Sequence, residues 1–214
     1  MINLVKGACP EILVKKQDEW TAALLAAQST ADRRRARAKY NHPQVKEALI
    51  SETAGKCAYC ESKLRHIQHG DIEHIRPKSD NPHLAFSWEN LTLACQICNQ
   101  RKSNLDPDFN NILDPYNGLA EDDIVFCGAL ASGAGRRSGA RTIDILGLNR
   151  PELIERRAER LGLLQLIIEK ILDQDIPAPV RAALLEDYRK TELASTSEFA
   201  AMARSQASFF FGEL

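Results

Sequence analysis

The chain has 214 residues, a length that allows one sizeable domain or two small ones. Hydrophobic residues make up 44% and charged residues 27%, which is ordinary for globular proteins and excludes wholesale disorder. The net charge of -1 gives no global support for nucleic-acid binding. The first residues lack the basic-then-apolar order of a signal peptide, and no apolar run approaches the ~20 residues of a membrane helix. We therefore expect a soluble, cytoplasmic protein with no membrane partner.

The first part of the chain, residues 1–55, is predicted to be helical. Residues 20–27 include several strong helix formers. Pro43 suits the first turn of a second helix, and Gly55 suits the turn that ends it. Residues 32–39 are strongly basic, and such a run is typical of a solvated helix face, with phosphate contact as the alternative. The charged residues of this run are Arg33, Arg34, Arg35, Arg37 and Lys39, against Asp32.

Four of the six cysteines form two Cys-x-x-Cys pairs, Cys57 with Cys60 and Cys95 with Cys98. Two close pairs in a chain without an export signal predict a metal site rather than disulfides. Four thiols suit one tetrahedral Zn²⁺, which is structural because no ligand position is open for water. The remaining cysteines are predicted to be small core residues or unreactive thiols. These two are Cys9 and Cys127.

Basic residues near the cysteine pairs are expected to offset the negative charge that four thiolates leave on one dication. Their closeness in the sequence is the basis of this expectation. They are Lys56, Lys63, Arg65, Arg101 and Lys102.

An acid, an imidazole and an amide lie in and beside the segment between the cysteine pairs. Glu73 and His74 end the run Asp71-Ile72-Glu73-His74, and Asn99 follows the second pair directly. A zinc that closes this segment brings Glu73 and His74 back toward Asn99. Such a group suits metal-assisted phosphodiester cleavage, with the imidazole as base. Oxygen ligands favour Mg²⁺ or Mn²⁺ over zinc as the catalytic ion.

The ordered pattern of these motifs resembles the HNH family of nucleases, whose active site is a ββα-metal fold. The matching segments are Cys57–Cys60, Glu73–Ser79, Trp88–Leu91 and Cys95–Lys102. Short β-prone pieces at residues 72–75 and 91–94, and a short helix after Cys98, are predicted for this module.

The resemblance implies a role for each residue of the motif. His74 is the general base, Glu73 and Asn99 ligate the catalytic ion, and Asn90 holds the loop or orients His74. Glu73 stands where many family members have Asp or His, and Asn99 stands where the last His of the family name often lies. Three basic residues are candidate phosphate contacts, or else exposed charges that balance the zinc site. They are Lys78, Arg101 and Lys102.

A longer resemblance, over roughly residues 1–165, links the chain to the PtuB nucleases of Septu anti-phage systems, some of them retron-linked. Its flanking motifs include Lys6-Gly7, Ile112–Tyr116 and Leu146–Arg150. This resemblance implies an ABC-type ATPase as partner. The resemblance does not extend to the chain after about Asp173.

We expect an α+β fold, mostly helical, with a small zinc-stabilised ββα-metal (HNH) core flanked by N-terminal and C-terminal helices. Four regions are predicted: helical residues 1–55, the nuclease core 56–105, an irregular glycine-rich loop region 106–140, and helical residues 141–214. In the last region, Asn149 is expected to cap a helix opened by Pro151, with two shorter helices after Pro179 and Ser197. Phe209–Phe211 are expected to dock on the core, or else on a partner.

Two functional hypotheses remain. The first is a metal-dependent HNH endonuclease that hydrolyses DNA phosphodiester bonds as the effector of an anti-phage system, together with an ABC-type ATPase. DNA is preferred to RNA by resemblance alone. The alternative is a non-catalytic, zinc-built nucleic-acid-binding or scaffolding module, which needs no Glu73, His74 and Asn99 constellation.

Overall fold

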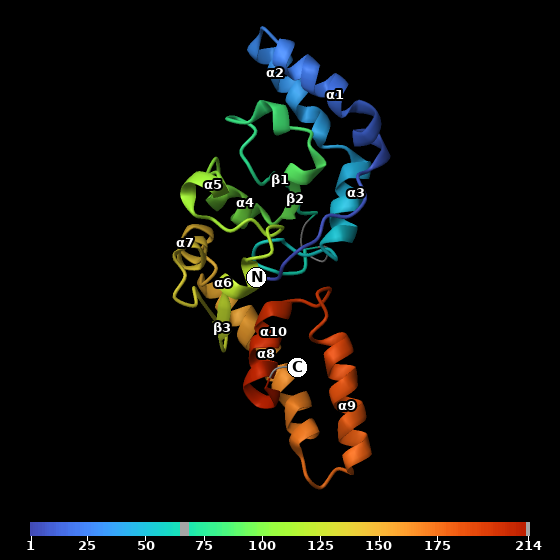
Figure 1. Cartoon of the computed structure of the whole chain (residues 1–214), viewed down its shortest axis with the longest axis vertical. Coiled ribbons are helices and arrows are strands. Elements are labelled where there is room, and N and C mark those ends of the chain that lie inside the picture. The colour runs from blue at the N-terminus through green and yellow to red at the C-terminus, as the bar shows by residue number, and fades with distance from the viewer. Residues whose placement is uncertain (65–68, 213–214) are drawn as a thin grey trace.

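The computed structural model describes residues 1–64 and 69–212, and helices account for most of this part of the chain (Figure 1). The mostly helical fold class with small sheets is confirmed. The helices are α1 (Glu11–Ala26), α2 (Thr30–Arg37), α3 (Pro43–Glu52), α4 (Gln96–Lys102), α5 (Pro107–Asn110), α6 (Ala120–Asp123), α7 (Arg137–Leu146), α8 (Pro151–Leu172), α9 (Ala178–Thr191) and α10 (Ala200–Phe211). The strands are β1 (Asp71–His74), β2 (Leu91–Ala94), β3 (Val125–Cys127) and β4 (Leu130–Ser132), with 3₁₀ turns η1 (Ala38–Tyr40), η2 (Pro82–Leu84) and η3 (Trp88–Asn90).

The predicted ββα unit forms the centre of the molecule. Strand β1 pairs with β2 in an antiparallel register that places Asp71 opposite Ala94 and His74 opposite Leu91. Helix α4 begins directly after Cys95, whose side chain accepts a hydrogen bond from the backbone N–H of Cys98 and so caps the helix. The short helix that carries Asn99 is therefore joined to the sheet without a loop.

The N-terminal region holds this unit from one side. Helix α1 contacts α2, α3 and η2, and the Trp20 ring meets the edge of Phe86 with 5.6 Å between centroids. Before α1, Lys6 Nζ donates to the carbonyl of Leu91 at 2.7 Å, and Trp88 Nε1 donates to the carbonyl of Gly7 at 2.8 Å. The segment before α1 is thus tied to β2 and to the turn that precedes it.

The region after the ββα unit differs from the irregular, glycine-rich loop that we predicted. It contains α5, α6, the β3–β4 hairpin and the start of α7. Gly128 lies in the hairpin turn with φ of +57°. Gly139 lies inside α7, and a Cβ there would come within 1.8 Å of the carbonyl oxygen of Asp123. These glycines serve a tight turn and a close helix contact rather than flexibility.

The C-terminal helices gather at the end of the molecule opposite α1 and α2 (Figure 1). Helix α8 packs against α9, and α10 contacts β3. Pro151 opens α8 as predicted, but Arg150 is the N-cap residue. The side chain of Asn149 instead bonds both backbone groups of Ala131, at 2.8 and 2.9 Å. The predicted capping role of Asn149 is wrong because a strand edge takes up its hydrogen bonds.

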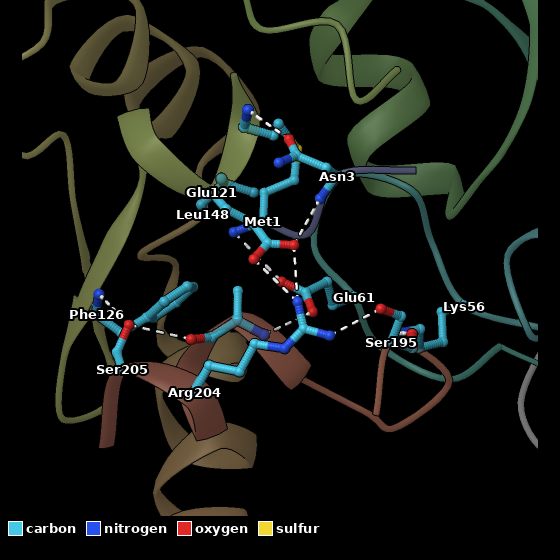
Figure 2. A network of polar contacts seen from close by, with 12 residues as sticks. Met1, Asn3, Lys56, Glu61, Glu121, Phe126, Leu148, Ser195, Arg204 and Ser205 are labelled. Atoms are coloured by element: carbon cyan, nitrogen blue, oxygen red, sulfur yellow. Dashed lines mark hydrogen bonds and ion pairs between the residues drawn. The ribbon is translucent and has the colours of Figure 1, made fainter. Parts of the chain in front are cut away.

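A polar network joins the C-terminal part to Lys56 and Glu61, which flank the first cysteine pair in the sequence (Figure 2). Arg204 of α10 pairs with both carboxylate oxygens of Glu121 at 2.9 Å. The backbone N–H of Ala201 donates to Glu61, the residue after Cys60. The buried Lys56 donates to main-chain carbonyls of the loop before α10. Lys56, the residue before Cys57, therefore anchors this loop beside the first cysteine pair.

One hydrophobic core runs through all three parts of the molecule, from Leu13 in α1 and Leu49 in α3 to Leu93 in β2, Leu164 in α8 and Met202 in α10. Phe210 and Phe211 pack against it, as predicted, whereas Phe209 is 83% exposed. Cys127 is exposed on β3, so of its two expected roles, core residue or unreactive thiol, the structure leaves the second. In the described part of the chain, no helix combines the length and the apolar character that crossing a membrane requires.

Candidate metal centre and catalytic site

The four paired cysteines form one buried cluster. Their Sγ atoms all lie within 4.8 Å of one another, and those of Cys60 and Cys95 are 3.9 Å apart. Tetrahedral Zn–S bonds of ~2.3 Å imply S···S separations of ~3.8 Å, so this cluster fits one zinc ion closely. The cluster lies at the end of the β1–β2 sheet where α4 begins, and the zinc it can hold would fix both elements.

The positive charge beside the thiols comes from Arg150, which the sequence analysis did not select for this role. Arg150, at the start of α8, places Nη1 4.0 Å from Cys98 Sγ. Lys102 is occupied elsewhere, as described below, and Arg65 lies outside the described residues. Among the described residues, a neighbour in space rather than in sequence thus places a cation beside the thiols, at the start of α8.

A second site lies on the other side of the ββα unit, in a cavity of about 500 Å³. This cavity is the candidate catalytic site and is named the catalytic cavity for that reason. It brings together three of the predicted site residues, Glu73, His74 and Asn99, with the candidate phosphate contact Lys78. Arg37 from α2 also lines it. Its remaining lining residues are Pro77, Ser79, Gln100, Ser103 and Asn104.

His74 is held in one tautomer at the end of β1. Its Nε2 lies 2.9 Å from the carbonyl oxygen of Ala85. Since a carbonyl only accepts, Nε2 carries the proton, and the lone pair is left on Nδ1. Nδ1 lies 3.4 Å from Lys78 Nζ, and the Tyr40 ring packs edge-on against the imidazole with 4.6 Å between centroids. Burial, and then the charge of Lys78, lowers the pKa of His74 to about 3, so the imidazole is neutral.

Glu73 precedes His74 on β1 and faces a buried cation. Its Oε1 lies 2.9 Å from Lys102 Nζ, and Lys102 also donates to the carbonyl of His74 at 2.9 Å. Burial raises the pKa of Glu73, and Lys102 opposes this shift. Lys102 is fully buried and pairs with Glu73, which leaves it neither of its two predicted roles, a phosphate contact or an exposed charge that balances the zinc site. The guanidinium of Arg101 lies against Gly147, and Arg101 does not line the catalytic cavity.

The amide of Asn99 is oriented by an acid that sequence reasoning passed over. Asn99 Nδ2 donates to Asp71 Oδ2 at 2.9 Å, which leaves Oδ1 available to another partner. Asp71 and Glu73 are two residues apart on one strand and therefore share a face. That spacing was the signal in the sequence that could have identified Asp71.

Asn90 shapes the loop that covers His74. Its Nδ2 donates to the carbonyls of Arg76 and Leu84 at 3.0 and 3.2 Å, and its Oδ1 accepts from the N–H of Arg76 at 2.7 Å. Leu84 precedes Ala85, whose carbonyl fixes the imidazole. Asn90 therefore touches the loop at both ends and reaches His74 only through it.

The oxygen atoms on the catalytic cavity suit a hard divalent cation. Glu73 Oε1 is buried, and the contact with Lys102 lacks the geometry of a hydrogen bond, so this oxygen has no hydrogen-bond partner among the described residues. Asn99 Oδ1 is the second candidate ligand. One carboxylate and one amide suit Mg²⁺ or Mn²⁺, which keep several waters and take further oxygens from phosphate.

The family comparison agrees with this geometry. Residues 57–105 match the family model described as HNH endonuclease. The segment spans the cysteine cluster, both strands and α4, so the central unit is an HNH endonuclease domain.

Relatives extend the likeness beyond this domain. The Septu protein PtuB of Bacillus thuringiensis is 26% identical over 175 residues, covering 81% of this chain and 65% of that protein. The Septu protein PtuB of Bacillus mycoides (strain KBAB4) is 30% identical over 166 residues, covering 63% and 56%. A "Retron Vc95 putative HNH endonuclease" of Vibrio cholerae serotype O1 biovar El Tor is 27% identical over 139 residues, covering 58% and 67%. The chain is thus a homologue of PtuB proteins and covers less than two thirds of the length of either one.

The cysteine cluster leads to a prediction about zinc. We expect elemental analysis to find about one zinc per chain. Cys57→Ser or Cys95→Ser should lose the zinc and unfold the central unit, because the two-stranded sheet depends on a metal whose apparent binding free energy is about 10–16 kcal/mol. Cys127→Ser, an exposed thiol on β3, is the matched control and should keep both zinc and thermal stability. Well-folded protein without zinc would contradict the prediction.

The environment of His74 leads to a prediction about its protonation. A free imidazole with a pKa of about 6.5 is mostly protonated at pH 5.5. Because the pKa of His74 is lowered in the folded protein, the ring should stay neutral from pH 8 to 5.5. The folding stability that the neutral ring contributes is lost only as pH falls from 6.5 toward 3, where the unfolded chain takes up a proton and the folded chain does not. Imidazole ¹⁵N chemical shifts of the zinc-loaded protein, recorded from pH 8 to 5.5, measure this. Lys78→Met should bring the titration closer to the ordinary range, and half-protonation of His74 between pH 6 and 7 in the native chain would contradict the prediction.

Proposed function

We propose that this chain is a metal-dependent endonuclease that hydrolyses phosphodiester bonds of DNA. One observation carries the proposal: Glu73, His74 and Asn99 converge on one cavity within a segment that matches the HNH endonuclease family. The roles of these residues rest on that convergence and on the chemistry of their atoms. The proposal also assigns the structural zinc to the cysteine cluster and the catalytic Mg²⁺ or Mn²⁺ to the cavity.

The proposed chemistry begins at His74. Its Nδ1 carries the lone pair of a neutral ring and faces Lys78 Nζ at 3.4 Å; with Lys78 turned to a phosphate, Nδ1 accepts a proton from a water molecule that attacks the phosphorus. The hydrogen bond to Ala85 holds the ring in this tautomer as the proton arrives. A divalent ion on Glu73 and Asn99, when bound, neutralises charge on the phosphate and on the departing 3′-oxygen.

The other residues of the cavity position these groups. Asp71 orients Asn99 so that its Oδ1 points away from the shared hydrogen bond, and Asn90 keeps the covering loop in place. Lys78 lies beside Nδ1 of His74 and is the candidate phosphate contact that the cavity retains. Asp71 and Asn90 are therefore positioning residues, because neither needs to touch the reacting atoms.

We further propose that the protein acts in an anti-phage defence system beside an ABC-type ATPase. The relatives named as Septu and retron proteins support the defence setting, and the longer resemblance to PtuB nucleases supports the ATPase. The reduced thiols of the cysteine cluster fit the cytoplasm, where disulfides are rare and zinc sites persist.

The non-catalytic scaffold remains the second candidate because of one observation. Lys102 already neutralises Glu73 in the structure, so the carboxylate has a cation without any metal. A zinc-built binding module could use this ion pair purely for stability. Measured cleavage by the native chain, lost in a variant of His74, distinguishes the two.

The first functional prediction concerns the base. His74→Ala should slow plasmid nicking in Mg²⁺ or Mn²⁺ by about 10²–10⁴-fold, the usual contribution of a general base. Since His74 is buried, His74→Gln is the second variant: its amide can still donate to the carbonyl of Ala85 but has no basic nitrogen. The control is His83→Gln, an exposed histidine in η2, which should cut like the native chain. Native rates in both variants of His74 would remove it from the mechanism.

The second functional prediction concerns the catalytic ion. Brief EDTA treatment should remove activity before it removes zinc, because a site with one carboxylate holds Mg²⁺ far more loosely than thiolates hold zinc. Mg²⁺ or Mn²⁺ should restore cutting and zinc alone should not. Asn99→Ala should raise the metal concentration needed for half-maximal activity, and Glu73→Gln should do so more strongly because it removes the charged ligand. Activity that survives EDTA, or that zinc alone restores, would oppose the assignment.

A further inference from the structure

We propose that one face of α2, formed by Arg33, Arg34 and Arg37, binds the backbone phosphates of the DNA strand next to the catalytic cavity. The inference rests on the proposed function and adds a location for substrate docking. The sequence allowed two interpretations of the basic run in α2, a solvated helix face or a phosphate contact. Three observations favour the phosphate contact.

The first observation is the charge of the face itself. Arg37 follows Arg34 by three residues and Arg33 by four, so the three arginines lie on one side of α2 within ~6 Å of helix axis. Asp32, the acidic residue of this helix, forms an ion pair with Arg35 at 3.5 Å and accepts a hydrogen bond from the hydroxyl of Ser29. Within the described residues, no carboxylate comes within 4.0 Å of the three face arginines. Uncompensated arginines are the residues best suited to phosphate.

The second observation is that the arginine face continues the catalytic cavity. A neighbouring hollow of about 390 Å³ is lined by Arg33, Arg34, Thr30 and Ser29. Arg37 lines both this hollow and the catalytic cavity. Its Nε is buried without a hydrogen-bond partner among the described residues. A donor left unpaired between two hollows lacks an acceptor, and a phosphate oxygen supplies one.

The third observation fixes α2 to the catalytic residues. The 3₁₀ turn η1 follows α2 directly, and its Tyr40 packs on His74. Lys78 Nζ lies 4.6 Å from the centre of the Tyr40 ring and 3.3 Å from its hydroxyl. The arginine face is therefore held at a set distance from the proposed base, which is what a docking element near a scissile bond requires.

The kind of ligand follows from geometry and charge. Phosphates of one DNA strand follow one another every ~3.4 Å along the axis, so the ~6 Å face spans about two of them. The whole chain carries a net charge of -1, so attraction of DNA depends on local basic surfaces such as this one. A strand that leaves the catalytic cavity past Arg37 meets Arg33 and Arg34 next.

The test is DNA binding by a non-cutting parent. The parent is full-length His74→Gln with its zinc, and the probe is a fluorescein-labelled 30-bp duplex followed by fluorescence anisotropy in Mg²⁺. Arg33→Gln/Arg34→Gln in this parent should raise Kd about tenfold at low salt and reduce the slope of log K against log salt by about 2. Arg189→Gln/Lys190→Gln on α9, two exposed residues with the same total charge change, is the matched control and should change Kd by less than about twofold.

Cutting kinetics with an intact His74 separate docking from chemistry. Arg33→Gln/Arg34→Gln should raise KM for plasmid DNA and keep kcat, since neither residue lines the catalytic cavity. If this double variant binds and cuts like the native chain, or if the α9 control weakens binding as much, the inference is overturned while the proposed function stands. If the native chain does not cut DNA with any divalent metal, and the His74→Gln parent does not bind the duplex, the proposed function fails and the inference fails with it.

Discussion

The four-cysteine cluster is the constraint on which the rest of the site depends. Strands β1 and β2 have four residues each, and a two-stranded sheet of that length is marginal by itself. The 34 residues between Cys60 and Cys95 return to their start through this sheet, so one metal on the cluster closes the whole segment. Cys95 is also the N-cap of α4, and Asn99 follows Cys98 directly. A metal on the cluster would therefore fix the position of Asn99 opposite β1 through the geometry of its ligands, without a large core.

The flanking regions supply packing, hydrogen bonds and positive charge that the small ββα unit lacks. Lys6 reaches the carbonyl of Leu91 in β2 and lies over the ring of Trp88 at 4.0 Å, and Tyr116 bonds Thr92 of the same strand. Arg150 approaches the thiol of Cys98 from α8. The flanking motifs of the sequence thus meet on the surface of the ββα unit away from the catalytic cavity. These flanking residues have a physical role beside the ββα unit, since they support its short sheet and its charge.

The sequence predicted what depends on local spacing. The cysteine pairs, the two strands and the helix that carries Asn99 follow from motifs within a few residues of one another. It did not predict Arg150 beside Cys98, Lys102 beneath Glu73, or Tyr40 against His74, because these contacts join elements whose packing is set only by the complete fold. Gly139 was wrongly assigned to a flexible loop for a related reason. The sequence alone does not distinguish a glycine that permits a close helix contact from one that makes a loop flexible.

The buried pair of Lys102 and Glu73 bears on how the proposed site is loaded. Lys102 supplies Glu73 with a positive neighbour, and Lys78 and Arg37 add two more cations around the cavity. A dication that approaches the cavity by itself meets this repulsion with one carboxylate to attract it. A DNA phosphate reverses the balance, because it brings negative charge and oxygen ligands together. On the proposed function, substrate and metal therefore favour each other's binding, and the arginines that draw the phosphate in also help to retain the ion.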